Sequence, residues 1–248
     1  MRCAFCVTTG HMGDAAFPRS TRRWGSGVAH FAGQWRGQPA FGKVLRYVIR
    51  MRRLVRTAAL GGVIGPAGFI GAWVIGAAAT SAPYSSIDEA ISRLAAVGSD
   101  TRWLMTAGFV TFGLALPVYA SALRATVPGR AWMTAAATGV ATLAVATAPL
   151  DRSETIDRLH AIFAGIGYLT LAATPLLAAA PLRAMGHRRL ARSGLAAGLT
   201  SVTALALTTT GLPTGLFQRV GLTVSDAWII ATALTVLRGV RQRVPRAK

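Results

Sequence analysis

The chain alternates between long apolar stretches and short clusters of charged residues. Six stretches are rich in Ala, Leu, Gly and Val, and they approach or exceed the roughly 20 apolar residues that a membrane-spanning helix needs. They lack the period-two alternation of β-strands. The pattern predicts an all-α integral membrane bundle of six transmembrane helices, at about residues 57–80, 103–123, 131–150, 160–182, 193–212 and 220–237.

The charged clusters between these stretches predict the orientation. Residues 51–56 before the first span and the segments between spans two and three, between spans four and five and after span six contain Arg or Lys but no acid. The alternate loops contain Asp88, Glu89, Asp100, Asp151, Glu154 and Asp157. Because basic loops stay on the cytoplasmic side, we expect a multi-pass protein of the plasma (inner) membrane with both termini cytoplasmic.

Composition supports this class and excludes others. Hydrophobic residues make up 52% of the 248 residues and charged residues only 14%, whereas a soluble domain carries about 25% charged residues. The formal charge is +19, but the basic residues bracket apolar spans instead of forming a stripe with interleaved aromatics, so no nucleic-acid partner is expected. Phosphate-loop, dinucleotide and zinc-protease motifs are absent, and we expect no cofactor.

The first fifty residues differ from the rest. They are basic and contain no apolar run of spanning length. We expect a disordered N-terminal extension over 1–50 and the transmembrane domain over 51–248, with the alternative that translation starts near Met51. Cys3 and Cys6 form a single C-x-x-C pair without the second half of a zinc site, so no metal is expected.

The first outer loop has a helical pattern of its own. Apolar residues recur at spacings of three and four at Ile87, Ala90, Ile91, Leu94 and Ala95. This pattern predicts a short amphipathic helix. We expect it to lie in the interface as a lid over the mouth of the bundle.

Asp226 is the only ionisable residue well inside a predicted span. Such residues are costly in a bilayer, so they are usually paired or functional. Arg219 lies seven residues earlier, two turns away on the same face, so the two side chains could approach each other directly or through water. The sequence leaves two roles open for Asp226, an ion pair that fixes the helix, and a ligand anchor or proton-transfer group. Trp228 is a candidate lining residue nearby.

Two further groups are candidate binding residues. Asp157 and His160 have the spacing of a carboxylate–imidazole metal pair, but a di-metal bundle needs a second such pair, so we expect His160 to hydrogen-bond Asp157 in a solvated turn. Ser92, in the first loop, has no identifiable partner base and no nucleophile-elbow motif. It is expected on a helix surface or cap and is retained only as a candidate ligand contact.

Short segments along the chain resemble one family of membrane proteins. They are Gly65-Pro66, Pro83-Tyr84-Ser85, the first loop and following span with Ile91-Ser92, Leu94, Trp103, Met105, Gly108-Phe109 and Gly113, then His160, Phe217-Gln218-Arg219 and Trp228. On these residues the range 58–240 resembles the bacterial and archaeal proteins of domain of unknown function family 998. The resemblance implies six spans and supplies no activity.

Three hypotheses for function follow. The first is a non-enzymatic protein that binds a lipid or other small amphiphile in an outward-facing pocket walled by Asp157, His160, Arg219 and Asp226. The second is an intramembrane enzyme, a cyclase or lipid-modifying type, with Asp226 as the acid or base. The third is a proton-coupled transporter, although the two halves show no evident repeat. The sequence does not fix the oligomeric state.

Overall fold

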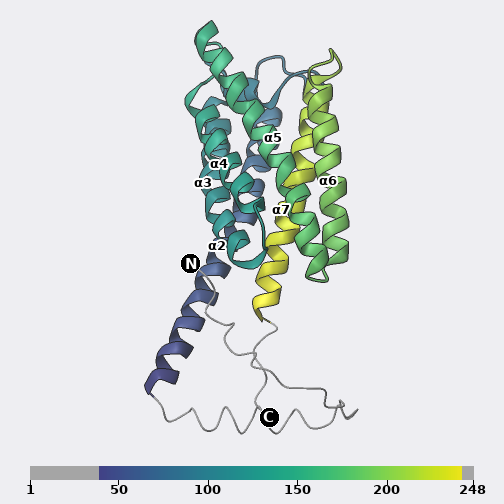
Figure 1. Cartoon of the computed structure of the whole chain (residues 1–248). Coiled ribbons are helices and arrows are strands. Elements are labelled where there is room, and N and C mark those ends of the chain that lie inside the picture. The colour runs from purple at the N-terminus through teal and green to yellow at the C-terminus, as the bar shows by residue number, and fades with distance from the viewer. Residues whose placement is uncertain (1–38, 242–248) are drawn as a thin grey trace. The chain divides into compact units, whose positions relative to one another are not determined.

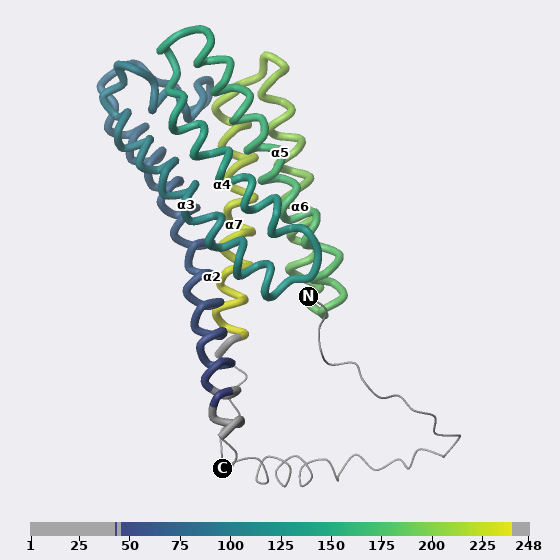
Figure 2. The backbone as a smooth tube through the Cα atoms, turned by 60° about the vertical axis from the view of Figure 1, so that its left-hand side comes forward, coloured from purple at the N-terminus to yellow at the C-terminus, as the bar shows by residue number. Residues whose placement is uncertain are grey.

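The computed structural model describes residues 39–241, and in them all regular structure is helical. Contacts divide the chain between Ile49 and Arg50, and the description below concerns the part that begins at Arg50. Figures 1 and 2 show its helices running up and down in sequence. They are α2 (Pro39–Ala79), the 3-10 helix η1 (Ile91–Ala95), α3 (Arg102–Thr126), α4 (Ala131–Thr147), α5 (Glu154–Ala184), α6 (Arg188–Leu207) and α7 (Thr214–Arg241).

Five of these helices are long and apolar enough to cross a membrane, namely α2, α3, α5, α6 and α7. The sixth, α4, is apolar but has only 17 residues. Its rise is about 26 Å, slightly less than the roughly 30 Å hydrocarbon core. The prediction of an all-α membrane bundle is confirmed, and each predicted apolar stretch corresponds to one helix. The count of six spans stays a prediction.

The first outer loop folds differently from the expected amphipathic helix, which is not confirmed. The segment forms the five-residue 3-10 helix η1, and its Ile91, Ser92, Leu94 and Ala95 are all buried. Instead of lying flat in the interface, η1 packs against α3 and α7. The loop is therefore part of the protein core.

The predictions for the N-terminal extension concern mainly residues that lie outside the described part of the chain. These include Cys3 and Cys6 and most of the range 1–50. The proposed start near Met51 and the 1–50/51–248 boundary stay predictions.

Glycines let α2 approach α3 closely. A Cβ added to Gly65 would lie 3.0 Å from the Cβ of Ala115, and one added to Gly68 would lie 2.8 Å from the Cγ2 of Thr111. At Gly61 an added Cβ would collide with the carbonyl oxygen of Ala115. Small residues at this spacing allow helix backbones to pack in a membrane, where lipid offers no hydrophobic drive between helices.

The short helix α4 is fixed on both sides. Toward α3, Gly139 faces Gly113, and a Cβ on Gly139 would lie 2.7 Å from the Gly113 carbonyl oxygen. Toward α5, the hydroxyls of Thr138 and Thr170 lie 2.9 Å apart, as do those of Thr134 and Thr174. Interhelical hydroxyl contacts of this kind add specificity where apolar packing alone is permissive.

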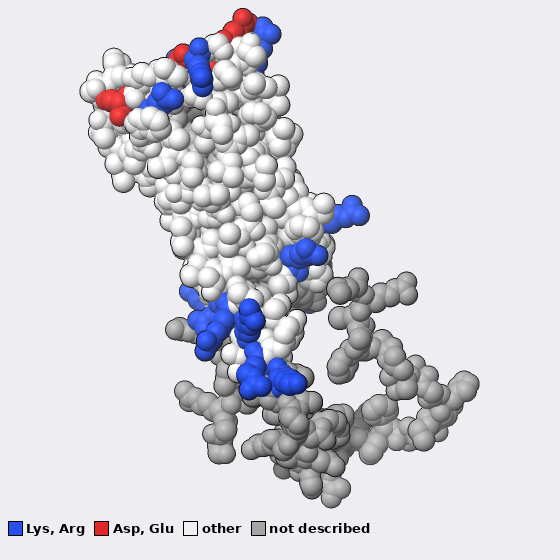
Figure 3. Space-filling view, turned by 90° about the vertical axis from the view of Figure 1, so that its left-hand side faces the viewer, with Lys and Arg blue, Asp and Glu red and all other residues white. Residues whose placement is uncertain are grey.

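Charge is distributed unequally between the two ends of the bundle. In the described residues, Asp88, Glu89, Asp100, Asp151, Glu154 and Asp157 all lie in the loops at the η1 end or in the first turn of α5. On the face shown in Figure 3, acidic side chains gather at that end, while only Lys and Arg appear near the opposite end. The band between them is uncharged, as a lipid-facing surface should be.

We predict that Gly139→Ala destabilises the bundle. The added methyl group would press on the Pro117 ring and on the Gly113 carbonyl, and overpacking of this kind costs about 1–3 kcal/mol. Thermal unfolding of the purified protein in detergent measures the effect. Gly165→Ala on α5 is the matched control, because a Cβ there meets open space. Equal melting temperatures for the two variants would contradict the close α3–α4 contact.

Candidate functional site

Arg219 of α7 is buried, with 9% of its surface exposed, and fastens the first outer loop to the bundle. Its guanidinium donates to the carbonyl oxygens of Ser86 (2.7 Å) and Glu89 (3.1 Å) in the loop and of Gly215 (2.9 Å) on α7. It also donates to the hydroxyl of Tyr84. The charge is thus solvated by loop oxygens instead of a carboxylate.

Aromatic rings complete the surroundings of this guanidinium. Its central carbon lies 5.2 Å from the ring centroid of Trp73 and 5.7 Å from that of Tyr84. A cation over an aromatic face is stabilised further when it is removed from water. Gly215 makes the approach of the loop possible, because a Cβ there would collide with the carbonyl oxygens of Glu89 and Ser86.

Gln218 makes the second link between the loop and the helices. Its side-chain oxygen accepts a hydrogen bond from the backbone N–H of Ile91 at 2.7 Å, and its amide donates to the hydroxyl of Tyr168 on α5. The amide therefore joins η1, α7 and α5 at one point. The adjacent residues Gln218 and Arg219 together hold the loop in place.

The outer rim of the loop is held by polar contacts in water. Asp100 accepts hydrogen bonds from the Ser81 N–H (2.7 Å), the Ser81 hydroxyl (2.6 Å) and the Thr80 hydroxyl (3.0 Å). The Ser81 bonds above all lower the pKa of Asp100 to about 2, so the carboxyl stays ionised. Burial raises the pKa of Tyr84 although Arg219 opposes it, so its phenol stays protonated. Arg93 pairs with Asp151 at 2.8 Å.

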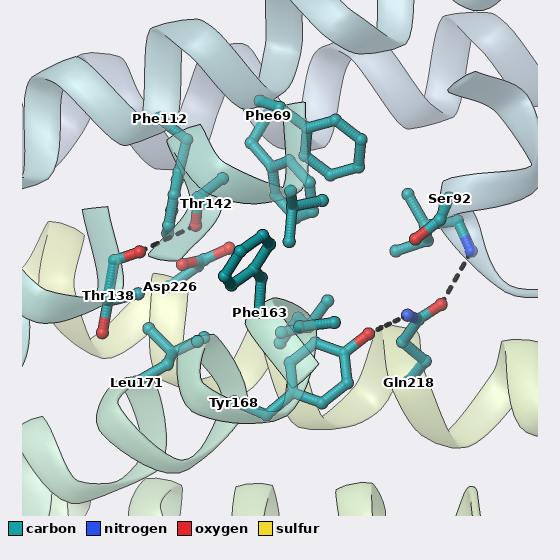
Figure 4. A pocket seen from close by; sticks show the side chains of 16 residues that line it. Phe69, Ser92, Phe112, Thr138, Thr142, Phe163, Tyr168, Leu171, Gln218 and Asp226 are labelled. Carbon is teal, nitrogen blue, oxygen red and sulfur yellow. Dashed lines mark hydrogen bonds between the residues drawn. The ribbon is translucent and has the colours of Figure 1, made fainter. Parts of the chain in front are cut away.

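Beneath this loop the bundle encloses a cavity (Figure 4). It measures about 50 Å³, room for a small polar group or a few water molecules. Residues from η1, α2, α3, α4, α5 and α7 line it. Its aromatic lining is Phe69, Phe109, Phe112, Phe163 and Tyr168, and its polar lining is Ser92, Thr138, Thr142, Gln218 and Asp226.

Asp226 is the ionisable residue of this lining, and the structure leaves it unpaired. The residue is 0% exposed, and neither carboxyl oxygen has a hydrogen-bond partner in the described part of the chain. Buried polar atoms are almost always hydrogen-bonded, and an unpaired buried carboxylate is especially costly. Figure 4 shows the carboxyl group among the residues that line the cavity.

The direct pairing of Arg219 with Asp226 that the sequence allows is therefore not formed in this structure. The seven-residue spacing does place both on α7, but Arg219 turns to the loop carbonyls and Tyr84. Within the described residues, the ion pairs are Arg93–Asp151 and Arg158–Glu154, both in exposed positions.

The other predicted site residues do not form one pocket. Ser92 is buried and lines the cavity with Asp226. Trp228 is buried but lies outside the cavity lining, and its indole N–H donates to the Leu190 carbonyl of α6 at 3.1 Å. An added Cβ at Gly194 would lie 2.9 Å from its Nε1, so Trp228 packs α6 against α7.

His160 and Asp157 act separately. The Nδ1 atom of His160 lies 2.7 Å from the Ala148 carbonyl oxygen and donates to it, so the predicted bond to Asp157 is not formed. Asp157 instead accepts from the backbone N–H of Asp151 at 3.0 Å. The other ring nitrogen of His160 is buried without a partner among the described residues. No group of three metal-ligating side chains occurs in the described residues.

Two important residues were not singled out for chemistry by the sequence analysis, Gln218 and Tyr168. Gln218 belongs to the Phe217-Gln218-Arg219 segment on which the family resemblance partly depends, and that segment was the available signal. Tyr168 stands among apolar residues of its span, so nothing in the local pattern marked it.

The arrangement has a simple chemical consequence. A lone carboxyl group faces a mainly apolar cavity, and the described residues supply it with no cation. It can accept a hydrogen bond from a group that enters the cavity, form an ion pair with a cationic group, or donate a proton.

Comparison with known proteins agrees with the resemblance found in the sequence. The family model described as Protein of unknown function (DUF998) matches residues 63–235. This range includes Arg219, Gln218 and the whole lining of the cavity. No curated protein and no solved structure matches the chain.

We predict that Arg219→Gln loosens the first loop. The carbonyl oxygens of Ser86 and Glu89 would lose their buried donor, and each unsatisfied buried group costs about 1–3 kcal/mol. The measurements are thermal unfolding in detergent and limited proteolysis within residues 81–101.

Arg93→Gln is the matched control for this prediction. It also removes one positive charge that contacts a neighbouring segment, but its ion pair with Asp151 is 46% and 48% exposed. Exposed pairs contribute about 0–1 kcal/mol. If both variants lose equal stability and protease resistance, Arg219 is not the anchor.

Proposed function

We propose that this chain has a binding role inside the membrane. The chain belongs to the family described as Protein of unknown function (DUF998). The protein is a six-span protein of the plasma (inner) membrane with both termini cytoplasmic. Its cavity receives the polar group of a lipid or other small amphiphile, and Asp226 is the anchor for that group.

The observation that carries this proposal is the unpaired carboxyl group of Asp226. The bundle buries it completely and offers neither oxygen a donor among the described residues. A ligand with a hydroxyl or amino group would supply that donor, which removes much of the desolvation penalty. The neighbouring cavity has room for such a group but for little more.

The rest of the cavity suits an amphiphile. Phenyl rings from α2, α3 and α5 form part of a mainly apolar lining, and binding sites for small molecules combine apolar walls with a few polar groups. The loop above is closed by Arg219 and Gln218. The hydrocarbon part would therefore lie among the helices and the surrounding lipid.

Two observations support the membrane topology. The described acids, apart from Asp226, lie at the η1 end, whereas the α3–α4 and α5–α6 turns carry only basic charges. The shortest helix, α4, is packed between α3 and α5 in the same up-and-down order as the others, and modest bilayer thinning accommodates a short span. No observation in the described residues specifically favours an enzymatic role or a transport role.

We predict opposite labelling of two engineered cysteines. In a background with Cys3→Ser and Cys6→Ser, a membrane-impermeant maleimide should label Arg152→Cys in intact cells. It should label Arg189→Cys only after the membrane is opened, because the basic turn is cytoplasmic. Both positions are exposed. Labelling of both in intact cells, or of Arg189→Cys alone, would overturn the topology.

We also predict that the protein retains an amphiphile through Asp226. A native mass spectrum of the full chain released from mild detergent should show a lipid-sized adduct. Occupancy should fall about tenfold or more in Asp226→Asn, because the carboxyl group that anchors the ligand is lost.

Ser225→Ala is the control for this experiment. Ser225 is also fully buried and unpartnered in the described part of the chain, but it does not line the cavity. Its adduct should be unchanged. A wild-type protein without an adduct, or a maximum number of bound adducts that is the same in Asp226→Asn as in the wild type, would count against the binding role.

A further inference from the structure

A second and larger pocket opens at the opposite end of the bundle from the first loop. It measures about 750 Å³, within the range of 300–1,000 Å³ typical of small-molecule sites. Its walls come from α2, the α3–α4 turn, the α5–α6 turn and the last turns of α7. None of the residues discussed above as a site forms part of it.

The ionisable side chains that line this pocket are two arginines and one histidine. Arg52 of α2 and Arg238 of α7 line it, together with His187 of the α5–α6 turn. All three side chains are exposed. Neither arginine forms an ion pair with a described residue, and the described acids of the loops lie at the other end of the bundle. The positive potential of the pocket is thus not neutralised by those residues.

The inner walls of the pocket are apolar. Leu182 is buried, with 3% of its surface exposed, and it lines the pocket with Leu190 and Val236. A free phosphate ion would gain nothing from such walls, whereas a hydrocarbon chain would bury its surface against them. Cationic side chains beside apolar walls match a molecule with an anionic head and an attached chain.

We infer that this pocket binds an anionic phospholipid of the cytoplasmic leaflet. The phosphate lies between Arg52 and Arg238, and the first part of an acyl chain lies against Leu182, Leu190 and Val236. Guanidinium groups suit phosphate because they donate several hydrogen bonds from one plane. Basic pockets between transmembrane helices on the cytoplasmic side bind acidic headgroups by the same chemistry.

The test is a lipid titration of the full chain in nonionic detergent, read by native mass spectrometry. The probes are phosphatidylglycerol and phosphatidylcholine with the same acyl chains. We expect phosphatidylglycerol to bind preferentially, and its affinity to fall about tenfold or more in Arg52→Gln/Arg238→Gln, since each cation contributes to headgroup attraction. Arg188→Gln/Arg189→Gln removes the same charge from exposed positions outside the pocket lining and should change affinity less than about threefold.

Two further arms keep the test decisive. Val236→Trp fills the pocket without changing charge, so it should also weaken phosphatidylglycerol binding, even where the double arginine variant fails to fold. Inorganic phosphate added at millimolar concentration should not displace the lipid. Equal loss in both double variants, no preference over phosphatidylcholine, no effect of Val236→Trp, or displacement by phosphate would each overturn the inference. Asp226→Asn should leave this binding unchanged, which separates it from the proposed cavity ligand.

Discussion

The hydrogen bonds of Arg219 to the first outer loop are the constraint on which the η1 end of the bundle depends. A guanidinium cannot lose its charge in a protein, so a buried arginine must be surrounded by acceptors. Here the loop supplies them from its own backbone, at Ser86 and Glu89. The loop is consequently fixed as part of the core, and η1 closes the end of the bundle above the cavity. Gln218, one residue earlier, continues the same function through Ile91 and Tyr168.

This use of Arg219 determines the chemistry of Asp226. Two opposite charges on one helix would ordinarily offset each other's desolvation, but Arg219 is committed to the loop and the carboxyl group remains alone. The cavity beside it exists because the helices do not close there. Glycines bring α2 to α3 and α3 to α4, whereas the rings of Phe69, Phe112 and Phe163 line the cavity together with the small residue Gly167. The cavity and the unpaired carboxyl group of Asp226 thus lie at the same place in the bundle.

The sequence pattern was sufficient for the helices and insufficient for their contacts. Apolar stretches locate the spans because lipid imposes length and hydrophobicity on each segment separately, and all six stretches are helices. Asp226 was also identifiable, since an acid in a span stands out. Its partner was not, because helical spacing says nothing about acceptors brought from a distant loop. For the same reason the three-and-four periodicity of residues 87–95 did not distinguish a lid from the buried 3-10 helix, and the bond of His160 to Ala148 could not be foreseen.

The two pockets differ in the polar groups that line them. Near the η1 end, a carboxyl group lies inside the bundle without a cation. At the other end, Arg52 and Arg238 line an open pocket without a described acid. Within the described residues, no cation pairs with Asp226 and no acid pairs with Arg52 or Arg238. Arg219, by contrast, has several acceptors. Arg219 itself keeps a buried Nε without a partner among the described residues, and molecules from outside the chain can pair with the groups that the bundle leaves unpaired. In a bilayer, the molecules always present to do so are amphiphiles, with donors on some and phosphates on others. The two proposed sites therefore call for lipids of different headgroup chemistry at the two ends of the bundle.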